Sequence, residues 1–137
     1  MIIPLLKGLG LTLSRFFSKP ITIQYPEEKL LPGKRWRGIQ YFEMDEKGKT
    51  KCVACGLCMA VCPSQCIYIE TAEDEQGNRY PLTYELDASR CIFCGFCEEA
   101  CPVKAIFLGK NYEWVEGDRG AYRMTTERLL EEKKLNP

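Results

Sequence analysis

The sequence contains no histidine, which excludes a Rieske-type iron–sulfur site, where histidines replace two of the cysteines. Its formal net charge is zero, so no global field favours binding to nucleic acid. It also lacks a long uninterrupted apolar run. The segment from Met1 to Phe17 is apolar but contains Lys7, and no small-residue cleavage site of a secretory signal follows. We therefore expect a protein of a reducing cytosol that does not bind nucleic acid.

Cysteine, in contrast, is abundant, with nine among the 137 residues. Such a count indicates either disulfide bonds or bound metal. The cysteines lie in two tight clusters, which suits metal ligation better than the cross-linking of distant loops. Together with the missing secretory signal, this clustering favours metal over disulfides.

The two cysteine clusters are copies of one motif, displaced by 39 residues from Cys52 to Cys91. Residues 52–58 align with residues 91–97, and Cys62-Pro63 aligns with Cys101-Pro102. We expect each copy to form a loop, a short helix that starts at the fourth cysteine, and a short strand.

The region around the two motifs has the pattern of a small α+β domain. The apolar triplets 67–69 and 106–108 are too short for helices and favour strands. The polar turn at 73–78 and the run at 80–86 predict a hairpin with the first triplet. We therefore predict a small α+β domain over residues 41–110, with a pseudo-twofold repeat.

Both motifs read C-x2-C-x2-C-x3-C-P, the spacing of bacterial proteins with two [4Fe–4S] clusters. The motifs therefore predict a two-cluster bacterial ferredoxin-like domain over residues 41–110. In this pattern three close cysteines bind one cluster, and the fourth binds the other cluster. Gly56 and Gly95 would let the backbone pass close to the clusters. The predicted ligands are Cys52, Cys55, Cys58 and Cys101 for the first [4Fe–4S] cluster, and Cys91, Cys94, Cys97 and Cys62 for the second.

Zinc is the main alternative, because paired C-x2-C motifs also bind structural zinc. A third cysteine and a Cys-Pro pair in both copies favour iron–sulfur clusters instead. A plant-type [2Fe–2S] site would need C-x4-C spacing.

The ninth cysteine, Cys66, aligns with Ala105, so we expect it to pack in the interior. The alternative for Cys66 is a redox thiol or a spare ligand. Apolar residues near the motifs are expected to shield the clusters from water: Leu57, Ile67, Ile69, Phe93, Phe96, Ile106 and Leu108.

The segments at the two ends of the chain are predicted to attach it to a membrane or to partner subunits. Residues 1–19 have the periodicity of an amphipathic helix, which we expect to lie at a membrane surface or to dock on a partner. The prolines and glycines of residues 20–40 predict an extended arm. Residues 111–137 are expected to form a C-terminal arm, with a short threonine-capped helix at 125–134.

The chain resembles subunit I of respiratory complex I, the NADH-quinone oxidoreductase. The matching stretches are 19–28, 37–38, 51–55, 89–102 and 127–130. The resemblance implies a peripheral position on the cytoplasmic side of the inner or plasma membrane, with residues 1–19 beside the quinone-module and membrane subunits. Electrons would arrive from the NADH-side iron–sulfur subunit and leave through the subunit that holds the terminal cluster. Quinone reduction would belong to other chains, so this one would have no active site for a substrate.

Two further interpretations stay open. One is the equivalent subunit of a membrane-bound hydrogenase or a ferredoxin-linked dehydrogenase. Residues 31–38 depart from the proteobacterial pattern, which leaves the electron donor open. The other is a free two-cluster ferredoxin, which would not need the segments on either side of the repeat.

Overall fold

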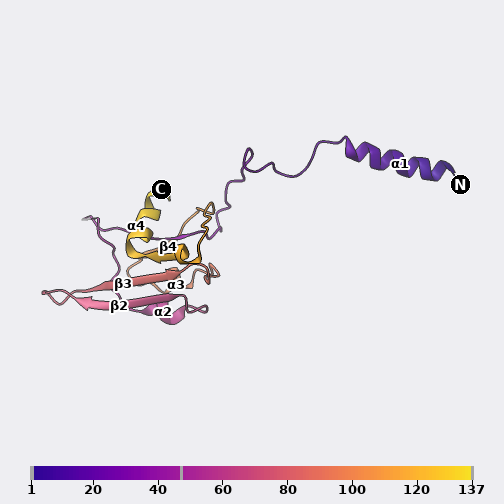
Figure 1. The fold of residues 1–137 in the computed structure, drawn as a ribbon. Helices are drawn as coiled ribbons and strands as arrows, with labels where there is room; N and C mark the ends of the chain where they lie inside the picture. The colour runs from indigo at the N-terminus through magenta and orange to yellow at the C-terminus, as the bar shows by residue number, and fades with distance from the viewer. Residues whose placement is uncertain (1, 47, 137) are drawn as a thin grey trace. The chain divides into compact units, whose positions relative to one another are not determined.

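The structure of the chain is a computed structural model that describes residues 2–46 and 48–136. It divides into two compact units, Met1–Pro32 and Gly33–Pro137. The first unit contains one helix, α1 (Ile2–Phe16), drawn in indigo in Figure 1. Pro4 lies in its first turn, where a missing backbone N–H breaks no helical hydrogen bond. The helix ends before the predicted position 19, and Ser18 Oγ donates to Arg15 O at 2.7 Å just beyond its end.

Among the described residues, no helix has the length and apolar character needed to cross a membrane.

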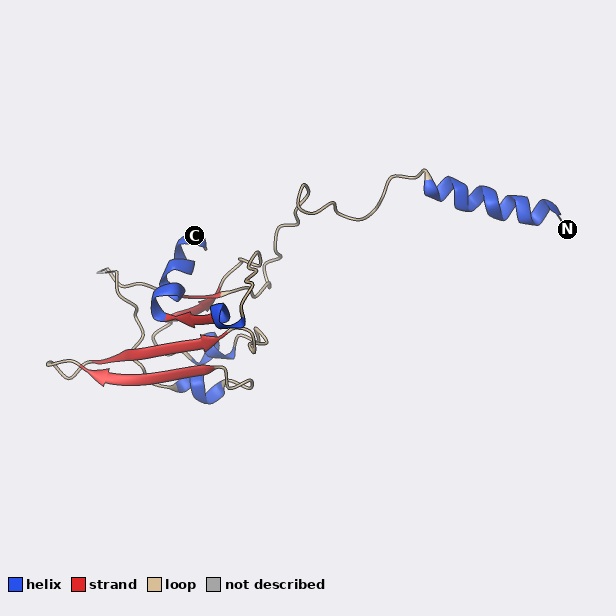
Figure 2. Cartoon of the chain, in the orientation of Figure 1, coloured by secondary structure: helices blue, strands red, loops and turns tan. Residues whose placement is uncertain are grey.

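The second unit contains two antiparallel sheets and several short helices (Figures 1 and 2). One sheet pairs β1 (Gln40–Phe42) with β4 (Ile106–Leu108). The other has the order β2-β3-β5, formed by β2 (Ile67–Glu73), β3 (Arg79–Asp87) and β5 (Arg123–Thr125). The helices are α2 (Leu57–Val61), α3 (Phe96–Ala100), the 3₁₀ helix η1 (Arg119–Tyr122) and α4 (Thr126–Leu135).

The hairpin of β2 and β3 forms where the sequence predicts one. Asp74 Oδ1 closes its loop by accepting hydrogen bonds from the backbone N–H groups of Gln76 and Asn78, at 2.9 and 2.8 Å. Pro81 pairs with Thr71, and the register shifts between Glu70 and Thr71. Proline has no N–H for the ladder, so an irregularity at this place follows from its chemistry.

Segments on both flanks of the predicted domain, residues 41–110, pack within the second unit. On the N-terminal side, Ile39 is buried, and the Gly38 N–H donates to Gly109 O at 2.8 Å. On the C-terminal side, Met124 of β5 and Leu129 of α4 are completely buried. Side chains from both flanks therefore complete the interior of the second unit.

The short helices α2 and α3 occupy matching positions in the two motifs, and both correct one prediction. Each helix ends one residue before the fourth cysteine, whereas the sequence placed that cysteine at a helix start. Cys62 and Cys101 have extended backbones, with ψ of 113° and 110°. The following proline disfavours helical geometry at the preceding residue, which explains why the helix stops there.

Candidate iron–sulfur sites

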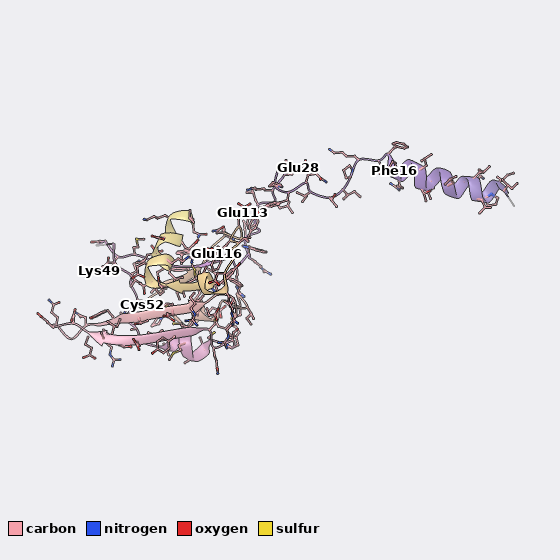
Figure 3. All side chains as sticks on the ribbon, viewed as in Figure 1. Phe16, Glu28, Lys49, Cys52, Glu113 and Glu116 are labelled. Carbon is pink, nitrogen blue, oxygen red and sulfur yellow. The ribbon has the colours of Figure 1, made fainter. Side chains whose placement is uncertain are left out.

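Two hollows in the second unit bring the predicted ligands together in two groups of four. The first hollow is lined by Cys52, Cys55 and Cys58 of the first motif and by Cys101 of the second. The second hollow is lined by Cys91, Cys94 and Cys97 of the second motif and by Cys62 of the first. Cys52, at the edge of the first hollow, is labelled in Figure 3.

The cysteines surround each hollow without meeting at one point. In the described part of the chain, no three cysteine, aspartate or glutamate side chains converge closely enough to hold a single metal ion. All nine cysteines lie within that part, and none of them forms a disulfide.

Three strands each contribute to the walls of both hollows. Side chains two residues apart on a strand point to the same face, so one strand reaches both hollows. Each of β1, β2 and β3 contributes one side chain to each hollow. The first hollow receives Phe42, Ile69 and Tyr84, and the second receives Gln40, Ile67 and Leu86.

The prediction of shielding residues is correct for some positions and wrong for others. Ile67, Ile69 and Ile106 line a hollow. Leu57 and Phe96 do not, since their helices leave them 48% and 46% exposed. Two further predicted positions line neither hollow: Leu108, and Phe93, which faces a separate aromatic groove.

Left-handed glycines set the start of both short helices. Gly56 has φ of +77° and Gly95 has φ of +87°, a region that favours glycine. Gly95 is also crowded: a Cβ there would lie 2.9 Å from Arg37 Nε. Arg37 Nη1 donates to Cys94 O, and Arg37 Nη2 lies 3.6 Å from Glu99 Oε1. Arg37 thus holds the loop of the second motif from outside, a contact that the sequence did not indicate.

Backbone N–H groups lie close to several of the cysteine sulfurs. Ala54 N and Phe93 N lie 3.4 Å from Cys52 Sγ and Cys91 Sγ, respectively. Positive φ angles at Ala54 and Phe93, of 49° and 53°, accompany these contacts at matching places in the two motifs. Such donors stabilise negative charge on sulfur, so the loops suit anionic ligands.

Two polar side chains that the sequence analysis missed also contact sulfur. Gln40 Nε2 donates to Cys91 Sγ at 3.0 Å. Tyr84 Oη lies 3.9 Å from Cys58 Sγ. Both residues lie on strands far from the motif that they contact, so the cysteine spacing carries no signal for them.

Burial acts against the charged form of the innermost thiols. It raises the pKa of Cys58 to about 11 and the pKa of Cys97 to about 12. The pKa of Cys91 is lowered, first by a hydrogen bond from Cys66 and further by Phe93 N–H and Gln40. Because a thiol binds metal as thiolate, loading of Cys58 and Cys97 would release protons at neutral pH.

Cys66 is buried, as predicted, but it lies beside a predicted ligand. Its Sγ is 3.5 Å from Cys62 Sγ, and it lines the second hollow. Ala105, its counterpart in the repeat, is equally enclosed.

Four thiols, apolar walls and N–H groups near sulfur make each hollow chemically suited to a [4Fe–4S] cluster. Comparison with known proteins points the same way, because residues 51–105 match the 4Fe-4S dicluster domain family. The family match and the structure agree on a small α+β protein with a domain of this type.

Curated relatives cover nearly the whole chain. The NADH-quinone oxidoreductase subunit I 2 of Geobacter metallireducens is 45% identical over 131 residues, which is 96% of this chain and 99% of the relative. Subunit I 1 of Geobacter sulfurreducens is 45% identical over 133 residues, 97% of this chain and 100% of the relative. Subunit I 2 of Rhizobium meliloti is 55% identical over 111 residues, and the matched part spans 59% of that longer protein.

A solved structure with a similar fold comes from the membrane-bound sulfane sulfur reductase, an archaeal respiratory membrane complex. Its matching chain has 30% sequence identity and a TM-score of 0.54, with coverage of 82% of this chain and 58% of that chain. The family predicted from the sequence is confirmed by the full-length matches. The chain belongs to the NADH-quinone oxidoreductase subunit I family.

Proposed function

We propose that the chain is the iron–sulfur subunit that relays single electrons within a membrane-associated NADH-quinone oxidoreductase. The observation that carries the proposal is the exchange of the fourth cysteine between the two motifs, which completes four thiols around each hollow. Cys52, Cys55, Cys58 and Cys101 would hold one [4Fe–4S] cluster, and Cys91, Cys94, Cys97 and Cys62 would hold the other. Each cluster supplies one-electron redox chemistry when bound.

The protein around the clusters would hold and insulate them without acting on a substrate. Four cysteines for each cluster leave no ligand position open, so we infer that the chain has no substrate site of its own. The strand side chains in both hollows exclude water, and the matching backbone geometry of the two motifs supports a pseudo-twofold arrangement of the sites.

Within the complex, the chain would take electrons from the NADH-side iron–sulfur subunit and pass them to the subunit with the terminal cluster. The names of the Geobacter relatives support this placement. The likeness to a chain of the sulfane sulfur reductase complex favours a second candidate, the equivalent subunit of a related membrane complex with another donor.

Helix α1 would attach the chain to the membrane surface, or to the quinone-module and membrane subunits, on the cytoplasmic side. Its apolar side chains support this role, because Leu5, Leu9 and Phe16 are all largely exposed within their unit. A basic residue, Arg15, lies in its last turn, which suits an anionic lipid surface.

Metal analysis of the natively purified chain tests the proposal. About eight iron and about eight acid-labile sulfide per chain are expected for two cubane clusters. Stoichiometric zinc without iron would contradict it. Co-purified subunits then separate the two candidates, and a native protein that stays a soluble monomer would contradict both.

A further inference from the structure

Strand β1 gives the two hollows walls of different chemistry. Its residues Gln40 and Phe42 lie on the same face, and each is 1% exposed. Phe42 lines the first hollow, and Gln40 lines the second. An apolar ring therefore stands beside one set of thiols where an amide stands beside the other.

The Gln40 amide is directed at sulfur. Its Nε2 donates to Cys91 Sγ at 3.0 Å, whereas its Oε1 is buried without a hydrogen-bond partner among the described residues. An unpaired buried oxygen is costly, and an apolar side chain in this place would avoid the cost. The pairing of β1 with β4 is made by backbone groups, so the strand itself does not need the amide.

Backbone N–H groups donate to sulfur in both hollows, and Ala105 N–H donates to Cys101 Sγ of the first hollow at 3.1 Å. Ala54 N and Phe93 N lie at the same 3.4 Å from the first cysteine of their own motifs. Tyr84, the polar neighbour of the first hollow, lies at the longer distance of 3.9 Å from Cys58 Sγ. Gln40 thus donates a short hydrogen bond to Cys91 Sγ. Cys52, the counterpart of Cys91 in the repeat, receives no such bond from a described side chain.

We propose that Gln40 is a positioning residue that raises the reduction potential of the cluster held by the Cys91 set. The inference rests on the proposed function. Reduction adds negative charge to the cluster and its thiolates, and an N–H donor to a ligand sulfur stabilises the more negative state. The hydrogen bond of Gln40 therefore favours residence of the electron on the second cluster.

Reductive titration of the full chain with both clusters, followed by electron paramagnetic resonance, tests the proposal. For Gln40→Leu we expect iron content to be retained and one of the two midpoint potentials to fall. The reduction equilibrium should change about tenfold, equal to about 59 mV for one electron. Gln40→Glu, which replaces the N–H donor by a carboxylate, should lower the same midpoint further. Gln76→Leu, the same substitution in the exposed hairpin loop, should move neither midpoint.

Three results would overturn the proposal. Unchanged midpoints in Gln40→Leu with full iron content would show that the amide does not tune the cluster. An equal shift of both midpoints would remove its selectivity. If Gln40→Leu loses iron, the titration is repeated with Gln40→Met, which keeps the side-chain length without the N–H donor. Loss of iron in both variants would show that Gln40 has only a structural role. Failure of the proposed function is distinct, because the unaltered chain would then lack two reducible clusters.

Discussion

Cys62 and Cys101 occupy the same place in their two motifs, and each lines the hollow formed by the first three cysteines of the other motif. Each follows a five-residue helix and precedes a proline. Under the proposed function the two sites would therefore share their ligands, and neither motif would be a complete site by itself.

This exchange predicts the effect of removing single ligands. Cys62→Ala should abolish the same spectroscopic signal as Cys97→Ala, although Cys62 lies in the first motif. Cys101→Ala should abolish the same signal as Cys58→Ala. Redox titration with electron paramagnetic resonance and iron analysis measures this, with about half of the iron lost in each variant if the second site survives. Loss of the Cys58 signal in Cys62→Ala would show that each motif binds its own cluster.

Cys66 should be dispensable for both clusters. Its counterpart Ala105 shows that the fold accepts alanine at this place, and both positions are buried. We expect Cys66→Ala to retain both spectroscopic signals and the full iron content, with a stability change within about 1 kcal/mol. Loss of the signal that Cys62→Ala abolishes would instead identify Cys66 as a ligand. The test is needed because Cys66 Sγ lies only 3.5 Å from Cys62 Sγ.

Alanine at the two helix-start glycines should have unequal effects. Both glycines have positive φ, so each substitution costs about 1–2 kcal/mol of backbone strain. Only at Gly95 would the new Cβ also meet the Arg37 guanidinium. Gly95→Ala should therefore lose its cluster faster in denaturant than Gly56→Ala, as followed by visible absorbance. In an Arg37→Ala background the difference should disappear, and its persistence would exclude Arg37 as the cause.

The C-terminal helix should contribute to the stability of the whole second unit. Leu129 of α4 is completely buried, so Leu129→Ala should lower the free energy of unfolding by about 2–5 kcal/mol. Leu135 in the same helix is 65% exposed and serves as the matched control, with a change within about 0.5 kcal/mol expected. Urea titration measures both, and equal effects would mean that α4 does not complete the core.

One charge on the apolar face of α1 should weaken membrane attachment. The helical periodicity of the sequence places Leu6 on that face and Ser14 on the opposite one. In flotation of the full chain with anionic vesicles, Leu6→Asp should reduce binding about tenfold more than Ser14→Asp. Equal binding of the two variants would leave docking on a partner subunit as the role of α1.

The cysteine spacing predicted two groups of four thiols, and the thiols of each group line one hollow. The repeat predicted a short helix in each motif, and the polar turn at 73–78 predicted the hairpin, because local sequence patterns determine local structure. The prediction that each helix begins at the fourth cysteine was wrong. Pro63 and Pro102 disfavour helical geometry at the residues before them, Cys62 and Cys101, so each helix ends before its fourth cysteine.

Contacts between distant segments were beyond the reach of the sequence. Gln40 looks like an ordinary polar residue of an arm until β1 pairs with β4 and brings it to Cys91. Arg37 and Met124 are similar cases, since both become informative only when segments from opposite ends of the domain pack together.

The spacing of the wall side chains on β1, β2 and β3 limits where the domain can accept insertions. Two residues along a strand span about 6.6 Å. Each of β1, β2 and β3 places one side chain in each hollow at this spacing, which fixes the distance between the two hollows. Insertion of one residue between Ile67 and Ile69 would turn one of these side chains away from its hollow. A change in the length of one of these strands would therefore disturb the walls of both hollows at once.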